Sequence, residues 1–252
     1  MAKFIGTAGD FMKEKALNRK LNAIVALFMS ITLTMFALGA IFGFLMARRN
    51  VWGGLGLVAA FALAIFCFKK FSQLFDRQIR LSRVEEKGAD GERDFVKYLK
   101  DLPDTFTVVS DLDFADSYGN IDHLIIGPTG VFAIDVKDWK GTVASDGKGE
   151  LLLNGKPTDK PQARYFTRRT MDLKARLKAL TTLEPYIQCV FAFMHTHVEA
   201  KWGTTGAVHC IRADQIVDYV TKARVKTPLP PADLPRLVSA AKSLKENAVQ
   251  AG

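Results

Sequence analysis

Residues 120–137 have the sequence NIDHLIIGPTGVFAIDVK, and this stretch decides the fold. It contains two apolar runs of strand length, and the Pro-Thr-Gly at 128–130 between them is typical of a tight turn. The stretch therefore predicts a β-hairpin with strands over 120–127 and 131–137. Acidic residues interrupt both apolar runs, and a charged group within such a strand must be paired or coordinate a metal.

The predicted hairpin brings three charged side chains together. Successive side chains of a strand point to opposite faces, so Asp135 and Lys137 share one face. A turn centred near Thr129 places Asp122 opposite about residue 136, beside Asp135. Neighbouring carboxylates repel each other, and a divalent cation that prefers oxygen ligands, Mg²⁺ or Mn²⁺, offsets that repulsion. A salt bridge between Asp135 and Lys137 is the alternative interpretation of this spacing.

The sequence around the hairpin alternates between helical and strand patterns. Glycines at 88 and 91 predict a helix break just before this region. Helices alternating with strands around one sheet predict a compact α/β domain over 88–225, followed by a Pro-rich linker and a C-terminal helix over 226–252. We expect further strands at 106–109, 141–144, 151–153, 186–193 and 207–211, and helices at 90–101, 161–183, 213–223 and 232–246.

The N-terminal quarter of the chain predicts a membrane anchor. Residues 21–47 contain no charged residue, and a second uncharged run covers 51–68. A membrane span needs about twenty apolar residues, and both runs are long enough. The short link between them predicts a transmembrane hairpin over 21–68, with an N-terminal segment over 1–20 before it and a juxtamembrane helix or linker over 69–87 after it. A signal peptide and a buried core helix are the alternatives.

The net charge of +9 is unevenly distributed. Thirteen Lys/Arg and five Asp/Glu occur up to Lys87, a net of +8, whereas the rest of the chain carries a net of +1. Basic residues that flank membrane spans face the cytoplasm. The pattern therefore predicts a multi-pass protein of the inner, cytoplasmic membrane with both termini in the cytoplasm, and the basic composition is weak evidence for nucleic-acid binding.

An ordered series of short motifs runs through the predicted domain. The series consists of Gly91-Glu at a helix start, Gly119-Asn-Ile-Asp-His, Gly127-Pro-Thr-Gly-Val-Phe, and Asp135-Val-Lys followed by Gly141. Together these motifs resemble the nuclease-related domain, NERD, over roughly 88–183. That family is placed with the PD-(D/E)XK nucleases. The resemblance implies a restriction-endonuclease-like mixed sheet flanked by helices, here preceded by two transmembrane helices.

The resemblance also implies roles for individual residues. Asp122 and Asp135 match the two acidic metal ligands, and Lys137 matches the catalytic lysine. Glu92 matches an acidic residue on the first helix, and Gln162 matches a recurrent polar position at the start of the helix after the strands. The implied cofactor is Mg²⁺ or Mn²⁺.

A basic pattern near the long second helix favours a nucleic-acid partner. Lys160, Arg164 and Arg168 recur every four residues, so we expect them on one helix face that contacts phosphates. A solvated helix face is the alternative.

The sequence leads to two hypotheses of function. The first is a membrane-anchored, Mg²⁺-dependent nuclease-like enzyme that hydrolyses phosphodiester bonds of nucleic acid, with DNA preferred over RNA. The second is a catalytically silent nucleic-acid- or protein-binding module tethered to the lipid bilayer. The sequence leaves the oligomeric state open.

Overall fold

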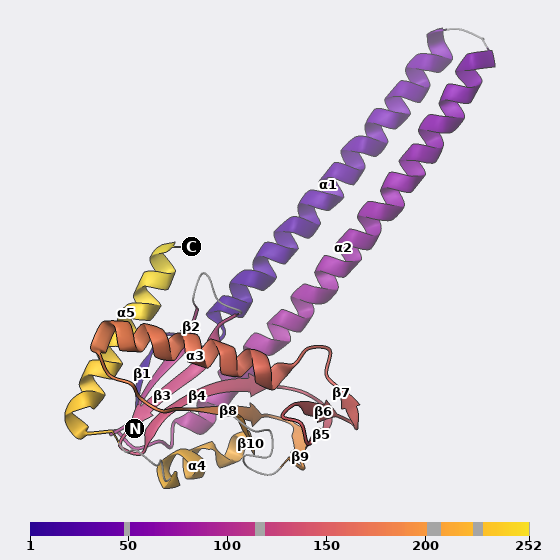
Figure 1. The fold of residues 1–252 in the computed structure, drawn as a ribbon. Coiled ribbons are helices and arrows are strands. Elements are labelled where there is room, and N and C mark those ends of the chain that lie inside the picture. Colours follow the sequence, from indigo (N-terminus) through magenta and orange to yellow (C-terminus); the bar gives the residue numbers. More distant parts are fainter. Residues whose placement is uncertain (48–50, 114–118, 201–207, 224–228, 252) are drawn as a thin grey trace. The chain divides into compact units, whose positions relative to one another are not determined.

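The computed structural model describes residues 1–47, 51–113, 119–200, 208–223 and 229–251 (Figure 1). The chain divides into two compact units. One unit comprises Met1–Phe11 together with Lys87–Gly252, and the other comprises Met12–Glu86.

The first unit is built on a six-stranded mixed sheet with the strand order β1-β2-β3-β4-β8-β10. The neighbours β2, β3 and β4 pair antiparallel, whereas β4, β8 and β10 pair parallel, as do β1 and β2. This sheet, flanked by helices, confirms the prediction of a mixed α/β domain. The strands are β1 (Lys3–Ile5), β2 (Thr107–Leu112), β3 (Ile121–Gly127), β4 (Gly130–Lys137), β8 (Ile187–Phe193) and β10 (Val208–Arg212).

A second, smaller sheet has the order β7-β6-β5-β9. The predicted strands at 141–144 and 151–153 are present as β5 and β6, whereas β7 and β9 had no clear pattern in the sequence. The bounds are β5 (Gly141–Ser145), β6 (Leu151–Leu153), β7 (Lys156–Pro157) and β9 (Thr196–Val198).

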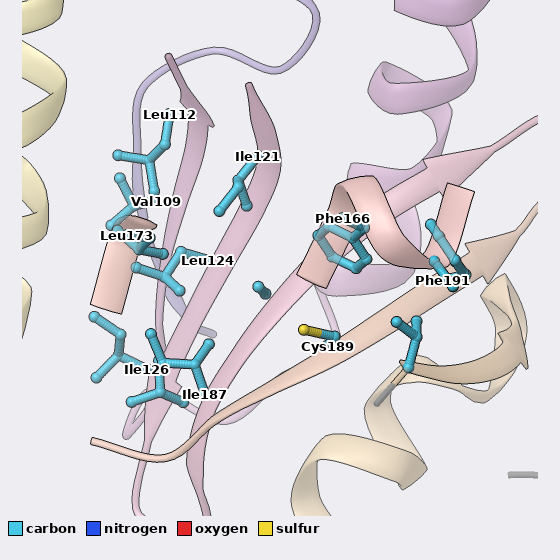
Figure 2. Packing of buried hydrophobic residues seen from close by; sticks show 14 of the residues in the cluster. Val109, Leu112, Ile121, Leu124, Ile126, Phe166, Leu173, Ile187, Cys189 and Phe191 are labelled. Carbon is cyan, nitrogen blue, oxygen red and sulfur yellow. The ribbon is translucent and has the colours of Figure 1, made fainter. Parts of the chain in front are cut away.

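Helices cover both faces of the large sheet. On one face, α3 (Gln162–Thr181) and α5 (Leu234–Ala251) contribute buried residues to the same hydrophobic cluster as Leu124 and Ala133 of the sheet. Figure 2 shows part of this cluster, in which Phe166 and Leu173 of α3 pack with sheet residues. On the other face, the end of α2 and α4 (Ile216–Lys222) pack with the alternate strand residues, among them Phe132 and Ile134. Alternation along each strand therefore produces two cores.

The predicted helix break at Gly88 and Gly91 is wrong. Helix α2 runs without interruption over Val51–Leu99 and continues from one unit into the other. A glycine inside a helix costs about 1 kcal/mol relative to alanine. Burial of Phe95 and Leu99 on the sheet outweighs that cost. Gly91 also allows a close approach, because a Cβ there would lie 3.2 Å from the Cβ of Asp138.

The first residues of the chain belong to the α/β unit. Strand β1 pairs parallel with β2, with Phe4 opposite Val108, and the backbone N–H of Ala2 donates to the carbonyl of Leu102 at 2.9 Å. Ala2 and Ala8 are buried. The sequence predicts no strand here, because three residues show no readable periodicity.

The second unit consists of α1 (Asp10–Ala47) from Met12 onward and the first part of α2. Within α1, Met12–Gly43 is long and apolar enough to cross a membrane, and little of its most apolar stretch is buried. It is the one such helix among the residues that the structure describes. The second predicted span, 51–68, falls mostly on residues whose side chains lie outside the described set.

Small side chains and several ion pairs between α1 and α2 characterise this unit. The side chains of Ala16, Ala23 and Ser30 are buried and lie seven residues apart, so they form one stripe along α1. The guanidinium of Arg19 on α1 pairs with Glu85 on α2 at 2.7 Å. The helical pair expected at the N-terminus is thus present.

Candidate active site

The hairpin of β3 and β4 places Asp122 beside Asp135. Its register pairs His123 with Ile134 and closes at Gly127 opposite Gly130, so the next pair outward is Asp122 with Asp135. The backbone N–H of Val136 donates to Asp122 Oδ2 at 2.6 Å. The predicted juxtaposition is confirmed, one residue away from the expected register, because two residues and not one form the turn.

Asp135 is held by two cationic side chains. Lys137 Nζ lies 2.7 Å from Oδ1, and Arg169 Nη2 lies 2.6 Å from Oδ2. Burial favours a raised pKa for Asp135, which is 2% exposed, but Lys137 and Arg169 hold the pKa of this carboxyl below its usual range. The salt bridge between Asp135 and Lys137, the alternative interpretation of the sequence, is therefore present.

Arg169 is a site residue that the sequence analysis did not single out. It lies on α3, with its side chain 12% exposed and its Cζ 5.3 Å from the ring centroid of Phe166. Nη1 donates to the carbonyl of Asn120 at 2.5 Å, and Nε is buried with no hydrogen-bond partner. Its spacing from the buried residues Phe166 and Leu173 places it on the inner stripe of α3, and this spacing was the one available signal.

Asp111 is a second unpredicted residue of the site. It lies in β2 between the pairs that join Ser110 to His123 and Leu112 to Ile121, so its position along the strand is opposite that of Asp122. Its φ of 59° is rare for a residue other than glycine, and such strained positions cluster at functional sites. The side chain is buried, and Asn120 Nδ2 donates to Asp111 Oδ1 at 2.9 Å.

Glu92 of α2 adds a further carboxylate. It is 4% exposed, and its Oε2 is buried without a hydrogen-bond partner. Burial, followed by the charges of Asp122, Asp111 and Asp135, raises the pKa of Glu92 to about 10. Burial and the charge of Asp135 raise the pKa of Asp122 to about 7. The site thus holds more carboxyl groups than its own cations pair with, and burial favours the protonated form of Glu92.

The family comparison covers this cluster. Residues 87–194 match the family model of NERD, the nuclease-related domain. The matched range contains the end of α2, strands β2 to β8, and α3. The match confirms the resemblance of these motifs to the nuclease-related domain. No curated protein and no solved structure matches the chain.

The carboxylates of this cluster fit a divalent metal in kind. Oxygen donors that repel one another, together with the unpartnered Oε2 of Glu92, suit a hard cation such as Mg²⁺. Their arrangement is not closed: within the described ranges, no three His, Cys, Asp or Glu side chains are grouped to hold a metal ion. Lys137 and Arg169 instead contact both oxygens of Asp135.

The remaining predicted residues lie on or before α3. Gln162 is the first residue of this helix, about two turns before Arg169. Arg164 and Arg168 are exposed on α3. The expectation that Lys160 shares their helix face is wrong, because the helix begins after it and its carbonyl accepts the Thr158 hydroxyl at 2.7 Å.

The carboxylate of Glu150 caps the start of α3. Glu150 Oε2 accepts the N–H of Ala163 at 3.0 Å, and Oε1 accepts the N–H of Arg164 at 2.9 Å. A negative charge at a helix N-terminus is favourable. Glu150 therefore fixes the start of the helix that delivers Arg169 to Asp135.

Proposed function

We propose that this protein is a membrane-anchored, metal-dependent nuclease that hydrolyses phosphodiester bonds of nucleic acid. The observation that best supports this proposal is the buried cluster of Asp122, Asp135 and Glu92 beside Lys137, within the range that matches the NERD family model. The six-stranded mixed sheet with α3 on one face supports the finer assignment to a restriction-endonuclease-like fold.

The proposed chemistry divides between the carboxylates and the lysine. Asp122 and Asp135, with help from Glu92, would hold Mg²⁺ or Mn²⁺. A bound divalent cation supplies an acidified water and neutralises charge on the phosphodiester. Lys137 is fixed beside Asp135 at 2.7 Å, where its ammonium would stabilise negative charge developing on the phosphate oxygens. Substitution of Lys137 should therefore slow cleavage more than it weakens nucleic-acid binding.

The proposed partners are DNA, in preference to RNA, and the lipid bilayer. Exposed Arg164 and Arg168 on α3 would contact backbone phosphates. The apolar helix Met12–Gly43 and the uncharged run at 51–68 would form a hairpin in the cytoplasmic membrane, with both termini in the cytoplasm. Green fluorescent protein fused to either terminus should fluoresce, and alkaline phosphatase inserted after Arg49 should be active. The reverse pattern would contradict this topology.

One observation favours the second candidate, a catalytically silent binding module. Both oxygens of Asp135 are engaged by cations of the chain itself, and the described residues contain no closed set of metal ligands. In this alternative the ion-paired cluster stabilises the domain, and nucleic acid or protein binds elsewhere on it.

Cleavage by the full-length protein in detergent micelles tests the proposal. Labelled single- and double-stranded DNA and RNA are incubated with Mg²⁺, with Mn²⁺ and with EDTA. The wild type is compared with D135N, K137M and the matched control D218N, which alters an exposed ion pair with Lys222 on α4. Metal-dependent cleavage that D135N and K137M lose and D218N keeps would support the nuclease. Folded wild-type protein that cleaves none of these substrates would favour the silent module.

A further inference from the structure

The charges in the candidate site are unequally matched. Asp135 alone balances two cations, Lys137 at 2.7 Å and Arg169 at 2.6 Å. Glu92, in contrast, has a buried oxygen without a partner. The neighbouring Asp122 accepts a backbone N–H from Val136. Arg169 therefore pairs with the same carboxylate that Lys137 already contacts.

The guanidinium of Arg169 is positioned from outside the hairpin. It arrives from α3, stacks near Phe166, and donates Nη1 to the carbonyl of Asn120 at 2.5 Å. Its Nε remains buried without an acceptor. An arginine whose only task was to hold α3 on the sheet would be expected to use this donor as well, because an unpaired buried donor costs free energy. The incomplete pairing favours a side chain that has two positions, of which the position against Asp135 is one.

We propose that Arg169 is a resident counter-ion that neutralises Asp135 in the metal-free protein and withdraws from Oδ2 when a divalent cation binds. Its guanidinium and the incoming cation carry charge of the same sign, so both cannot contact one carboxylate oxygen at full strength. Arg169 thus acts as a positioning residue, through Asp135. This inference rests on the proposed function, because it takes the carboxylate cluster as the cation's site.

The inference predicts an unusual sign for one substitution. Removing the guanidinium should tighten cation binding, because it removes a competing positive charge and frees an oxygen of Asp135. The expected change is about tenfold in the dissociation constant, from the repulsion between charges a few ångströms apart. A merely structural arginine predicts the opposite, since a disordered site binds metal more weakly.

Calorimetric titration of the full-length protein in detergent micelles with Mn²⁺ alone, without nucleic acid, tests this sign. The variants are R169M, R169K and the matched control R176M, which alters an arginine of the same helix that pairs with Asp172 at the surface. R169M should bind Mn²⁺ about tenfold more tightly than wild type, R169K should fall between them, and R176M should match wild type. Without metal, R169M should melt at a lower temperature, and Mn²⁺ should raise its Tm by more than that of wild type.

The outcomes separate this inference from the proposed function. Wild type that binds Mn²⁺ and cleaves, with R169M and R169K binding no more tightly, would overturn the counter-ion role and leave the nuclease intact. If R169M does not fold, R169K decides by the same criterion. Absence of Mn²⁺ binding in every folded protein would overturn both the proposed metal site and this inference.

Discussion

Substitution of Asp122 by asparagine should stabilise the metal-free protein while abolishing its proposed activity. Asp122 is 6% exposed, and its carboxylate accepts one backbone N–H, from Val136 at 2.6 Å. Asparagine is of nearly the same size, and its side-chain oxygen can accept the same hydrogen bond. D122N therefore removes a poorly compensated buried charge and keeps the contact.

The magnitude and its pH dependence follow from the raised pKa of Asp122. The pKa is 3.8 for the ordinary carboxyl and about 7 in the folded protein. A raised folded pKa means that the stability contributed by protonation is complete below about pH 4 and is lost as the pH rises to about 7. The difference corresponds to at most about 4 kcal/mol at alkaline pH. After allowance for coupling within the cluster, we expect D122N to gain roughly 1–3 kcal/mol, or roughly 3–10 °C in Tm.

Thermal unfolding followed by tryptophan fluorescence, in EDTA, measures this gain. Trp139 packs 5.7 Å from the ring of Phe193 and reports on the α/β unit. The Tm difference between D122N and wild type should be near zero at about pH 4, should grow to about pH 7 and should then stay constant. D135N is the contrasting variant: it leaves Lys137 and Arg169 unpaired and should lose about 3–5 kcal/mol. A lower Tm for D122N at alkaline pH, or a gap independent of pH, would refute the reasoning.

Three further predictions concern stability. E150A removes the cap of α3 and should cost about 1–2 kcal/mol, or roughly 2–6 °C in Tm, whereas E184Q at an exposed pair should leave the Tm unchanged. A fragment that starts at Gly88 lacks β1 and exposes the edge of β2, so light scattering should show more aggregation than for the same fragment joined to residues 1–11 by a flexible linker. Burial lowers the pKa of His123 to about 3. Between about pH 6.5 and 3, therefore, only the unfolded chain binds a proton at this residue. The stability advantage of wild type over H123Q should shrink on acidification, by about 1.4 kcal/mol per pH unit.

The hairpin could be predicted because its signals are local. Alternation of side chains fixes which charges share a face, and Pro-Thr-Gly fixes the turn. The register differed by one residue from the expectation because Gly127 pairs with Gly130, which leaves two residues in the turn. Asp122 and Asp135 stay neighbours in either register, so this part of the site could be inferred before the structure was known.

Features that depend on distant packing were missed or mispredicted. Glycines at 88 and 91 predicted a break, but a local cost of about 1 kcal/mol each is smaller than the gain from burying an apolar helix face such as that of Phe95 and Leu99. Strand β1 exists through pairing with β2, about a hundred residues away in the chain. A strand of three residues contains too little sequence pattern to predict such a pairing.

The residues of the site divide in the same way, into those that a local motif predicts and those that depend on distant packing. The hairpin supplies Asp122, Asp135 and Lys137, all within one motif, whereas Arg169 arrives from α3 and Asp111 requires a left-handed backbone. Arg169 lies in a run of basic residues, and only its inward direction distinguishes it. A matching motif therefore identifies the carboxylates but not the charge that balances them. Whether the cluster binds a metal or remains a closed ion-pair network depends on how readily Arg169 leaves Asp135, and the Mn²⁺ affinity of R169M measures that competition directly.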